Sequence, residues 1–83
     1  MSLVETGVFI VIQRFPGRKE ALKRLFKRSR SFRTLCEDYR QCELAIRRWD
    51  ATLSEEASER RAEYAALIRQ LEAEILRELD NNV

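Results

Sequence analysis

The chain has 83 residues, of which 45% are hydrophobic and 36% are charged, and its formal net charge is +2. This length holds one small domain, and because such a chain buries only about 60% of the surface that it exposes when unfolded, we expect it to self-associate. The hydrophobic content argues against disorder in residues 18–79, and the near balance of charges argues against a purely polycationic nucleic-acid binder.

The charges are segregated along the sequence. Residues 14–48 contain 12 Lys or Arg and 4 Asp or Glu, a net charge of +8, whereas residues 49–83 contain 4 basic and 9 acidic residues, a net charge of −5. Opposite charges on two segments favour their lying side by side in an antiparallel pair.

The first predicted element is a short strand. Residues 8–12 read Val-Phe-Ile-Val-Ile, a run rich in β-branched and aromatic side chains. Because a lone strand would expose an unpaired edge, we expect it to pair with or pack against another subunit. The alternatives are that the run extends the following helix backward or rests in a lattice contact.

Residues 1–14 are predicted to be an N-terminal extension, with Met1-Ser2-Leu3 as an expression leader. The apolar run is far shorter than the ~20 residues needed to cross a bilayer. No Lys or Arg precedes it and no cleavage pattern follows, so it does not resemble a signal peptide. The sequence therefore predicts a cytoplasmic location.

The remaining residues, 15–83, are predicted to form a single helical domain. No Gly or Pro follows Gly17, and apolar residues recur at alternating steps of three and four, which is typical of amphipathic helix. The sequence Phe15-Pro16-Gly17 marks the beginning, because Pro is tolerated only near the amino end of a helix. The first helix is expected at about 17–50, and its interaction seam comprises Phe32, Leu35, Tyr39, Cys42, Ile46, Trp49 and Leu53.

A turn is predicted at about 50–54, because continuing the first heptad register would bury charged side chains in the seam. Thr52 followed by Glu55 matches a capping box. The second helix is expected at about 55–80, and its seam comprises Tyr64, Ile68, Leu71 and Ile75. The alternative is a single bent helix about 100 Å long in a coiled coil with other chains, since one register slip is tolerated.

These elements predict an all-α fold, an antiparallel two-helix hairpin with coiled-coil-like packing. Two helices bury one seam each and leave the outer flanks of Phe26, Leu67 and Leu76 exposed. A dimer that closes into a four-helix bundle, or a larger helical assembly, would cover these flanks.

Residues 18–33 are strongly basic, with eight Lys or Arg and one Glu. On a helix, the apolar residues lie on one side and most of the cations on the other. A candidate phosphate-contacting face, here named the basic face, comprises Lys23, Arg24, Lys27, Arg28 and Arg30. The other interpretations are a membrane-surface helix with Leu22, Leu25 and Phe26 as its wedge, and a solvated face that pairs with the acidic second helix. We favour the last, then nucleic acid, then a membrane.

The sequence shows no catalytic constellation. It has no His, no Gly-rich phosphate loop and no nucleophile elbow. Cys36 and Cys42 lie six residues apart, about 9 Å along the axis of one helix, and point to different faces, so they form neither a disulfide nor a zinc site. We expect no enzyme activity, no metal and no cofactor, and we expect both Cys to be small apolar core residues.

A known family shares the spacing of several residues in this chain: Phe15-Pro16, Leu25, Phe32, Leu35, Ile46 and the motif Leu71-Glu72-Ala73-Glu74-Ile75-Leu76. On these residues the chain resembles the YdcH-like family of short bacterial helical-hairpin proteins, over most of residues 15–79. The resemblance implies a hairpin fold and no particular function, because the role of that family is generally unassigned. Family members carry a Lys-rich stretch before the closing motif, whereas this chain has Ala65-Ala66-Leu67-Ile68-Arg69-Gln70. Residues 1–14 precede the usual start of the family, so the resemblance implies either a misplaced start codon or a real added strand.

We therefore expect a small self-associating helical protein that acts as a protein–protein interaction or scaffolding module. Its expected partners are copies of itself and an unidentified protein. The first alternative is a nucleic-acid accessory protein that uses the basic face, and the least favoured is a peripheral binder of membrane surfaces.

Overall fold

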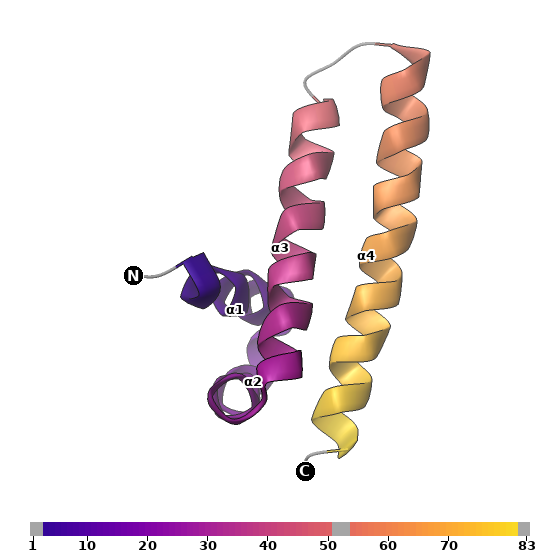
Figure 1. Cartoon of the computed structure of the whole chain (residues 1–83). Helices are drawn as coiled ribbons and strands as arrows, with labels where there is room; N and C mark the ends of the chain where they lie inside the picture. Colours follow the sequence, from indigo (N-terminus) through magenta and orange to yellow (C-terminus); the bar gives the residue numbers. More distant parts are fainter. Residues whose placement is uncertain (1–2, 51–53, 82–83) are drawn as a thin grey trace.

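The computed structural model describes residues 3–50 and 54–81, with side chains from Gly7 onward. All secondary structure in these residues is helical, which confirms the all-α class. The elements are α1 (Leu3–Arg14), the 3-10 helix η1 (Pro16–Arg18), α2 (Lys19–Arg28), α3 (Arg30–Asp50) and α4 (Glu55–Asn81). Helices α3 and α4 lie side by side and run in opposite directions, and α1 and α2 lie against the half of α3 nearer its amino end (Figure 1).

One hydrophobic core joins all four α-helices at the end of the molecule where α1 and α2 lie. Its buried residues are Val11, Leu22, Leu25, Phe32, Cys36, Tyr39, Cys42, Leu71, Ile75 and Leu79. Val11 of α1 belongs to this core, so α1 packs together with the helices of residues 15–81. None of the described helices is long and apolar enough to cross a membrane.

The predicted strand at residues 8–12 is wrong, because this run lies within α1 and packs on α3 of its own chain. Val8 and Val11 are three residues apart, so a helix places both on one face, whereas a strand would point them to opposite faces. Both side chains are buried, at 6% and 0% exposure. Burial against α3 therefore outweighs the β-propensity of the run.

The first helix expected at about 17–50 is divided at Ser29, whose backbone is extended (φ −120°, ψ 115°). The Ser29 N–H donates to the Leu25 carbonyl at 2.9 Å, and the Ser29 Oγ accepts from the Phe32 N–H at 3.1 Å. Arg33 Nη1 donates to the carbonyl of Phe26 at 2.8 Å. These bonds provide partners for backbone groups at the end of α2 and the beginning of α3, although no Gly or Pro is present. The spacing of the apolar residues therefore does not predict that the helix is interrupted here.

The second helix expected at about 55–80 corresponds to α4. Its amino end is capped by Ser54, whose Oγ accepts from the Ala57 N–H at 3.1 Å. Arg61 of α4 donates to the Trp49 carbonyl at 3.0 Å, which holds the carboxyl end of α3. Within the expected turn, the cap residue Thr52 and the seam residue Leu53 lie outside the described residues.

Replacing Gly7 by Ala is expected to destabilise the protein, although Ala favours helix over Gly by about 1 kcal/mol. An added Cβ would lie 3.1 Å from the Cys36 carbonyl oxygen, so α1 would have to move away from α3. Thermal unfolding followed by circular dichroism measures the effect, with about 1 kcal/mol giving a shift of about 4–8 °C.

The matched control is Gly17→Ala. A Cβ at Gly17 meets nothing within 4 Å, and its φ is not positive, so this variant should gain about 0.5 kcal/mol by restricting the unfolded chain. A raised unfolding temperature in both variants, at equal protein concentration, would contradict the close contact between α1 and α3.

Candidate interaction surfaces

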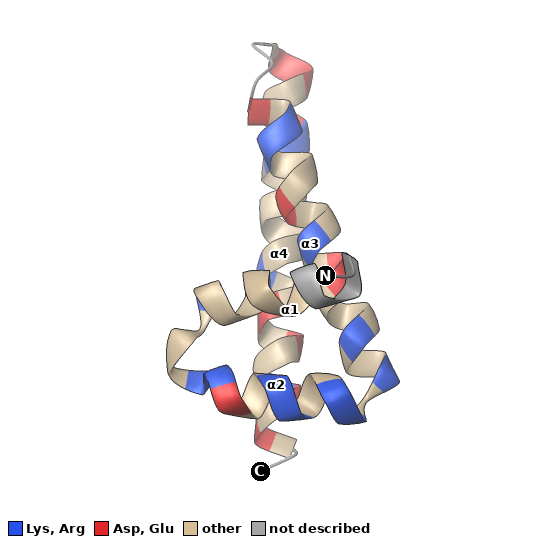
Figure 2. Ribbon diagram, turned by 90° about the vertical axis from the view of Figure 1, so that its left-hand side faces the viewer, with Lys and Arg blue, Asp and Glu red and all other residues tan. Residues whose placement is uncertain are grey.

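The apolar side of α2 is buried in the core. Leu22 and Leu25 are 0% and 2% exposed, and Ala21 and Phe26 pack against the same core. This orientation leaves most basic residues of α2 exposed. Figure 2 shows basic positions along α2 and at the beginning of α3. The side chains predicted as a membrane wedge therefore lie inside the protein and do not project from its surface.

The basic face is exposed except at Lys23, which is half-buried. Among the described residues, none of Lys23, Arg24, Lys27 and Arg30 forms an ion pair. The expected pairing with the acidic second helix is made instead by residues that precede α2. Arg14 bonds Glu72 at 2.5 Å, and Arg18 lies 4.0 Å from Asp80.

The structure brings most of the predicted seam together. Five of the predicted seam residues are buried in the core: Phe32, Tyr39, Cys42, Leu71 and Ile75. Leu35, Tyr64 and Ile68 are half-buried and pack against that core. Ile46 and Trp49 are also half-buried but lie outside the core cluster.

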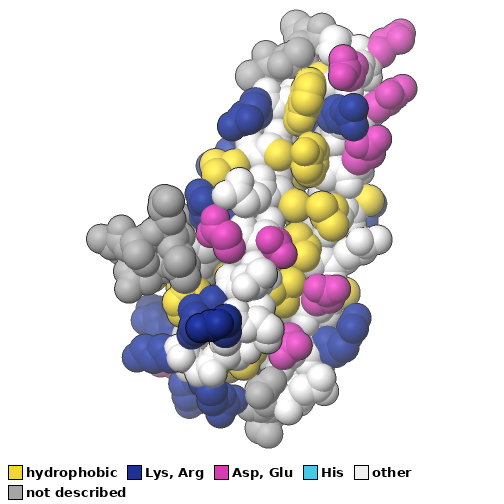
Figure 3. All heavy atoms as spheres, in the orientation of Figure 1, with side chains coloured by type: hydrophobic (Ala, Val, Ile, Leu, Met, Phe, Trp, Pro, Cys, Tyr) yellow, Lys and Arg dark blue, Asp and Glu magenta, His cyan; other side chains and the backbone are white. Residues whose placement is uncertain are grey.

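None of the described helices covers the other end of the α3–α4 pair (Figure 1). We name residues 43–50 and 54–70 the two-helix half. Among its residues only Ala57 is buried. The large apolar side chains that remain half-buried or exposed there are Leu44, Ile46, Trp49, Tyr64, Leu67 and Ile68. Figure 3 shows apolar side chains in a stripe along this end of the pair, between charged flanks.

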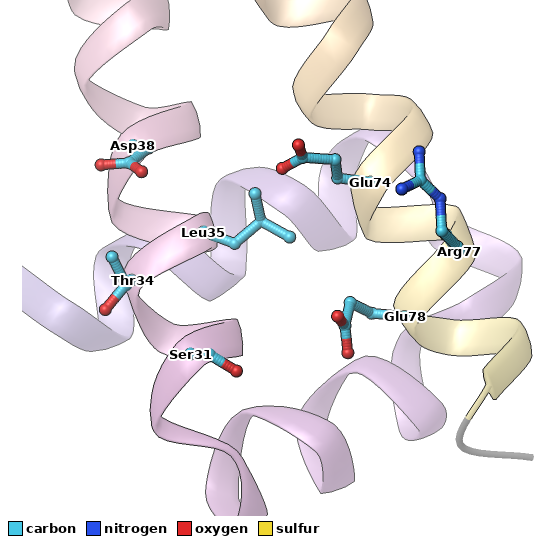
Figure 4. A pocket seen from close by; sticks show the side chains of 7 residues that line it. All are labelled: Ser31, Thr34, Leu35, Asp38, Glu74, Arg77 and Glu78. Carbon is cyan, nitrogen blue, oxygen red and sulfur yellow. The ribbon is translucent and has the colours of Figure 1, made fainter.

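A hollow of about 390 Å³ lies between α3 and α4 nearer the core end (Figure 4). Leu35 and Glu74 extend toward one another across it, and α1 and α2 pass behind. Its lining is completed by Ser31, Thr34, Asp38, Arg77 and Glu78. Three carboxylates and one guanidinium around a single Leu give this hollow a polar rim, and no described group there is a buried acid or base.

Tyr39, Glu72 and Arg14 link three helices. The Glu72 Oε2 accepts hydrogen bonds from the Tyr39 hydroxyl at 2.9 Å and from Arg14 Nε at 2.5 Å. The bond to Glu72 raises the pKa of Arg14, and burial, followed by the bond to Glu72, raises the pKa of Tyr39. No local pattern of the sequence connects Glu72 with Arg14, 58 residues away, so this contact could not be predicted.

Cys36 and Cys42 are buried free thiols. Burial raises the pKa of Cys36 to about 12 and, with the charges of Asp38 and Glu43, raises the pKa of Cys42. Both are thus protonated near neutral pH and act as small core side chains. The described residues contain no group of three His, Cys, Asp or Glu that could hold a metal ion.

Comparison with known proteins finds no match to this chain among family models, curated proteins or solved structures. The resemblance to the YdcH-like family therefore stays a prediction from the spacing of its residues.

The raised pKa values of Cys36 and Tyr39 predict loss of stability in alkali. The folded chain holds both protons more tightly than the unfolded chain, whose groups titrate near their ordinary values of 9 and 10. Their contribution is complete below pH 9 and declines as the pH rises toward 12, by up to ~1.4 kcal/mol per pH unit and group. Urea unfolding under reducing conditions between pH 7 and about pH 11 measures the decline.

Cys36→Ala and Tyr39→Phe provide the comparison. Each variant is less stable than the original chain at pH 7, because it loses packing or a hydrogen bond, but its stability falls less steeply above pH 9. An unchanged slope in both variants would show that other groups cause the alkaline decline.

Proposed function

We propose that the chain is a small self-associating interaction or scaffolding module, in which α3 and α4 act as a hairpin and the two-helix half docks on a second copy. One observation carries the proposal: every large apolar side chain in that half remains half-buried or exposed. In the other half, α1 and α2 supply the cover that a helical pair needs. A second copy of the chain would cover the apolar side chains of the two-helix half, as in a four-helix bundle.

The most exposed of these side chains identify the contact. Leu44 and Leu67 are each 40% exposed. Fully burying a Leu contributes about 1.5–3 kcal/mol. A two-fold contact uses each residue twice, so even partial burial of Leu44 and Leu67 favours association of the two copies.

Charges on the flanks favour one arrangement of the copies. Arg47 and Arg48 of α3 and Glu56 and Glu59 of α4 lie at the same end of the molecule, and all four are exposed. None of them forms an ion pair among the described residues. A two-fold axis parallel to the helices sets α4 of one copy beside α3 of the other, so that these opposite charges face each other and favour this pairing.

The same proposal includes membership of the YdcH-like family and a cytoplasmic location. The family resemblance is supported by the burial of its shared positions Leu25, Phe32 and Ile75 in one core. The location is supported by Cys36 and Cys42, which are free thiols, as is usual in a reducing compartment. We propose binding rather than catalysis, since packing and charge are the properties that the described surface offers.

Replacing Leu67 by Glu is expected to abolish self-association while leaving the single chain folded, because the side chain is already 40% exposed. Light scattering coupled to gel filtration should give at least twice 9.9 kDa for the original chain and 9.9 kDa for the variant. Circular dichroism checks that helicity is retained.

Leu76→Glu is the matched control. Leu76 lies on the same helix with 38% exposure but belongs to the other half of the molecule, so this variant should keep the mass of the original chain. A mass of 9.9 kDa for the original chain across concentrations, or equal dissociation of both variants, would reject the two-helix half as the contact.

A further inference from the structure

We infer that the basic face binds the phosphate backbone of nucleic acid without regard to base sequence. The face consists of Lys23, Arg24, Lys27, Arg28 and Arg30, on the outer side of α2 and at the first residue of α3. Its direction is fixed, since Leu22 and Leu25 anchor the opposite side of α2 in the core. The cations therefore form a rigid surface rather than a mobile tail.

The spacing of the cations suits a row of phosphates. Lys23 and Lys27, and likewise Arg24 and Arg28, are four residues apart, so each pair lies on one side of α2 at about 6 Å along its axis. The bend at Ser29 places Arg30 at the amino end of α3, where the helix dipole adds partial positive charge.

Basic residues outnumber acidic ones on this surface among the described residues. Glu20 is the one acidic residue of α2, against five basic residues. Lys23, Arg24, Lys27 and Arg30 have no ion-pair partner among the described residues. Arg33, which also lies in this region, instead bonds the carbonyl groups of Phe26 and Lys27.

Nucleic acid fits this surface better than a membrane. A membrane-surface helix inserts its own apolar side into the lipid, and the apolar side of α2 is already buried in the core. Phosphate contacts need only exposed cations and the positive field that they create. Phe9 on α1 is 41% exposed, and it is a large apolar side chain outside α2 that a membrane could contact.

The experiment is fluorescence anisotropy with a labelled short duplex DNA, the corresponding RNA duplex and a single strand. Four neutralised phosphates predict a slope of log affinity against log salt of about −3.6 on duplex DNA, a loss of roughly 100-fold between 50 and 200 mM salt. Duplexes of unrelated sequence should bind equally.

The test variant is Arg24→Gln with Lys27→Gln, and the control is Arg69→Gln with Arg77→Gln. Both remove two positive charges from exposed helical positions, and Gln preserves helix propensity. The test variant should bind at least about tenfold more weakly at 50 mM salt, with a slope about 2 smaller in magnitude, whereas the control keeps most of the affinity. Equal thermal unfolding of the two variants excludes loss of fold as the cause.

Three results would overturn the inference. The first is no binding to any of the nucleic acids at 50 mM salt, and the second is equal weakening by both variants, which would mean that total charge rather than this face determines binding. The third is binding that is stronger to vesicles of phosphatidylcholine and phosphatidylserine than to the duplex and that is lost in the test variant, which would assign the face to anionic lipid.

Discussion

Two antiparallel helices bury only the side chains that lie between them, and this limit governs the structure. At one end of the α3–α4 pair, α1 and α2 add further cover, and Phe32, Tyr39 and Ile75 are at most 1% exposed. At the other end the pair stands by itself, and Trp49 and Ile68 are only half-buried. The apolar side chains are therefore fully buried at one end of the pair and only partly buried at the other. The positions of α1 and α2 determine both proposed surfaces, the two-helix half and the basic face.

Helix α2 has two roles that depend on each other. Leu22 and Leu25 close the core over α3, and the same contacts turn the cations of α2 toward solvent. The division at Ser29 makes this possible, because a continuous helix from α2 through α3 would carry Leu22 and Leu25 past the end of the core. Arg33 stabilises the division by binding the carbonyl groups at the end of α2.

Elements whose signals are local could be predicted from the sequence. Apolar residues recur along α4 with helical spacing, and Leu22 and Leu25 alternate with cations along α2. Both patterns span only a few turns of helix, so they can be recognised from neighbouring residues. The helical state of residues 8–12 depends on Gly7, which meets the backbone of Cys36, and the position of Glu72 depends on Arg14. Contacts between residues that are far apart in the sequence cannot be predicted from the pattern of neighbouring residues. For the same reason the sequence predicts the cations of the basic face and the exposed flank at Leu67. It does not predict where the two-helix half begins, since that depends on where α1 folds.

Among the described residues, most cations of α2 do not pair with the acidic helix α4, and the relative size of two effects explains why. Burying Leu22 and Leu25 contributes about 3–6 kcal/mol together, whereas an exposed ion pair contributes about 0–1 kcal/mol. The apolar side chains therefore decide which side of α2 faces α4, and the cations are held on the other side. Arg14 and Arg18, which lie outside α2, make the contacts with α4 instead. A helix oriented by its apolar side retains its surplus charge, so that surplus is available to a partner outside the chain.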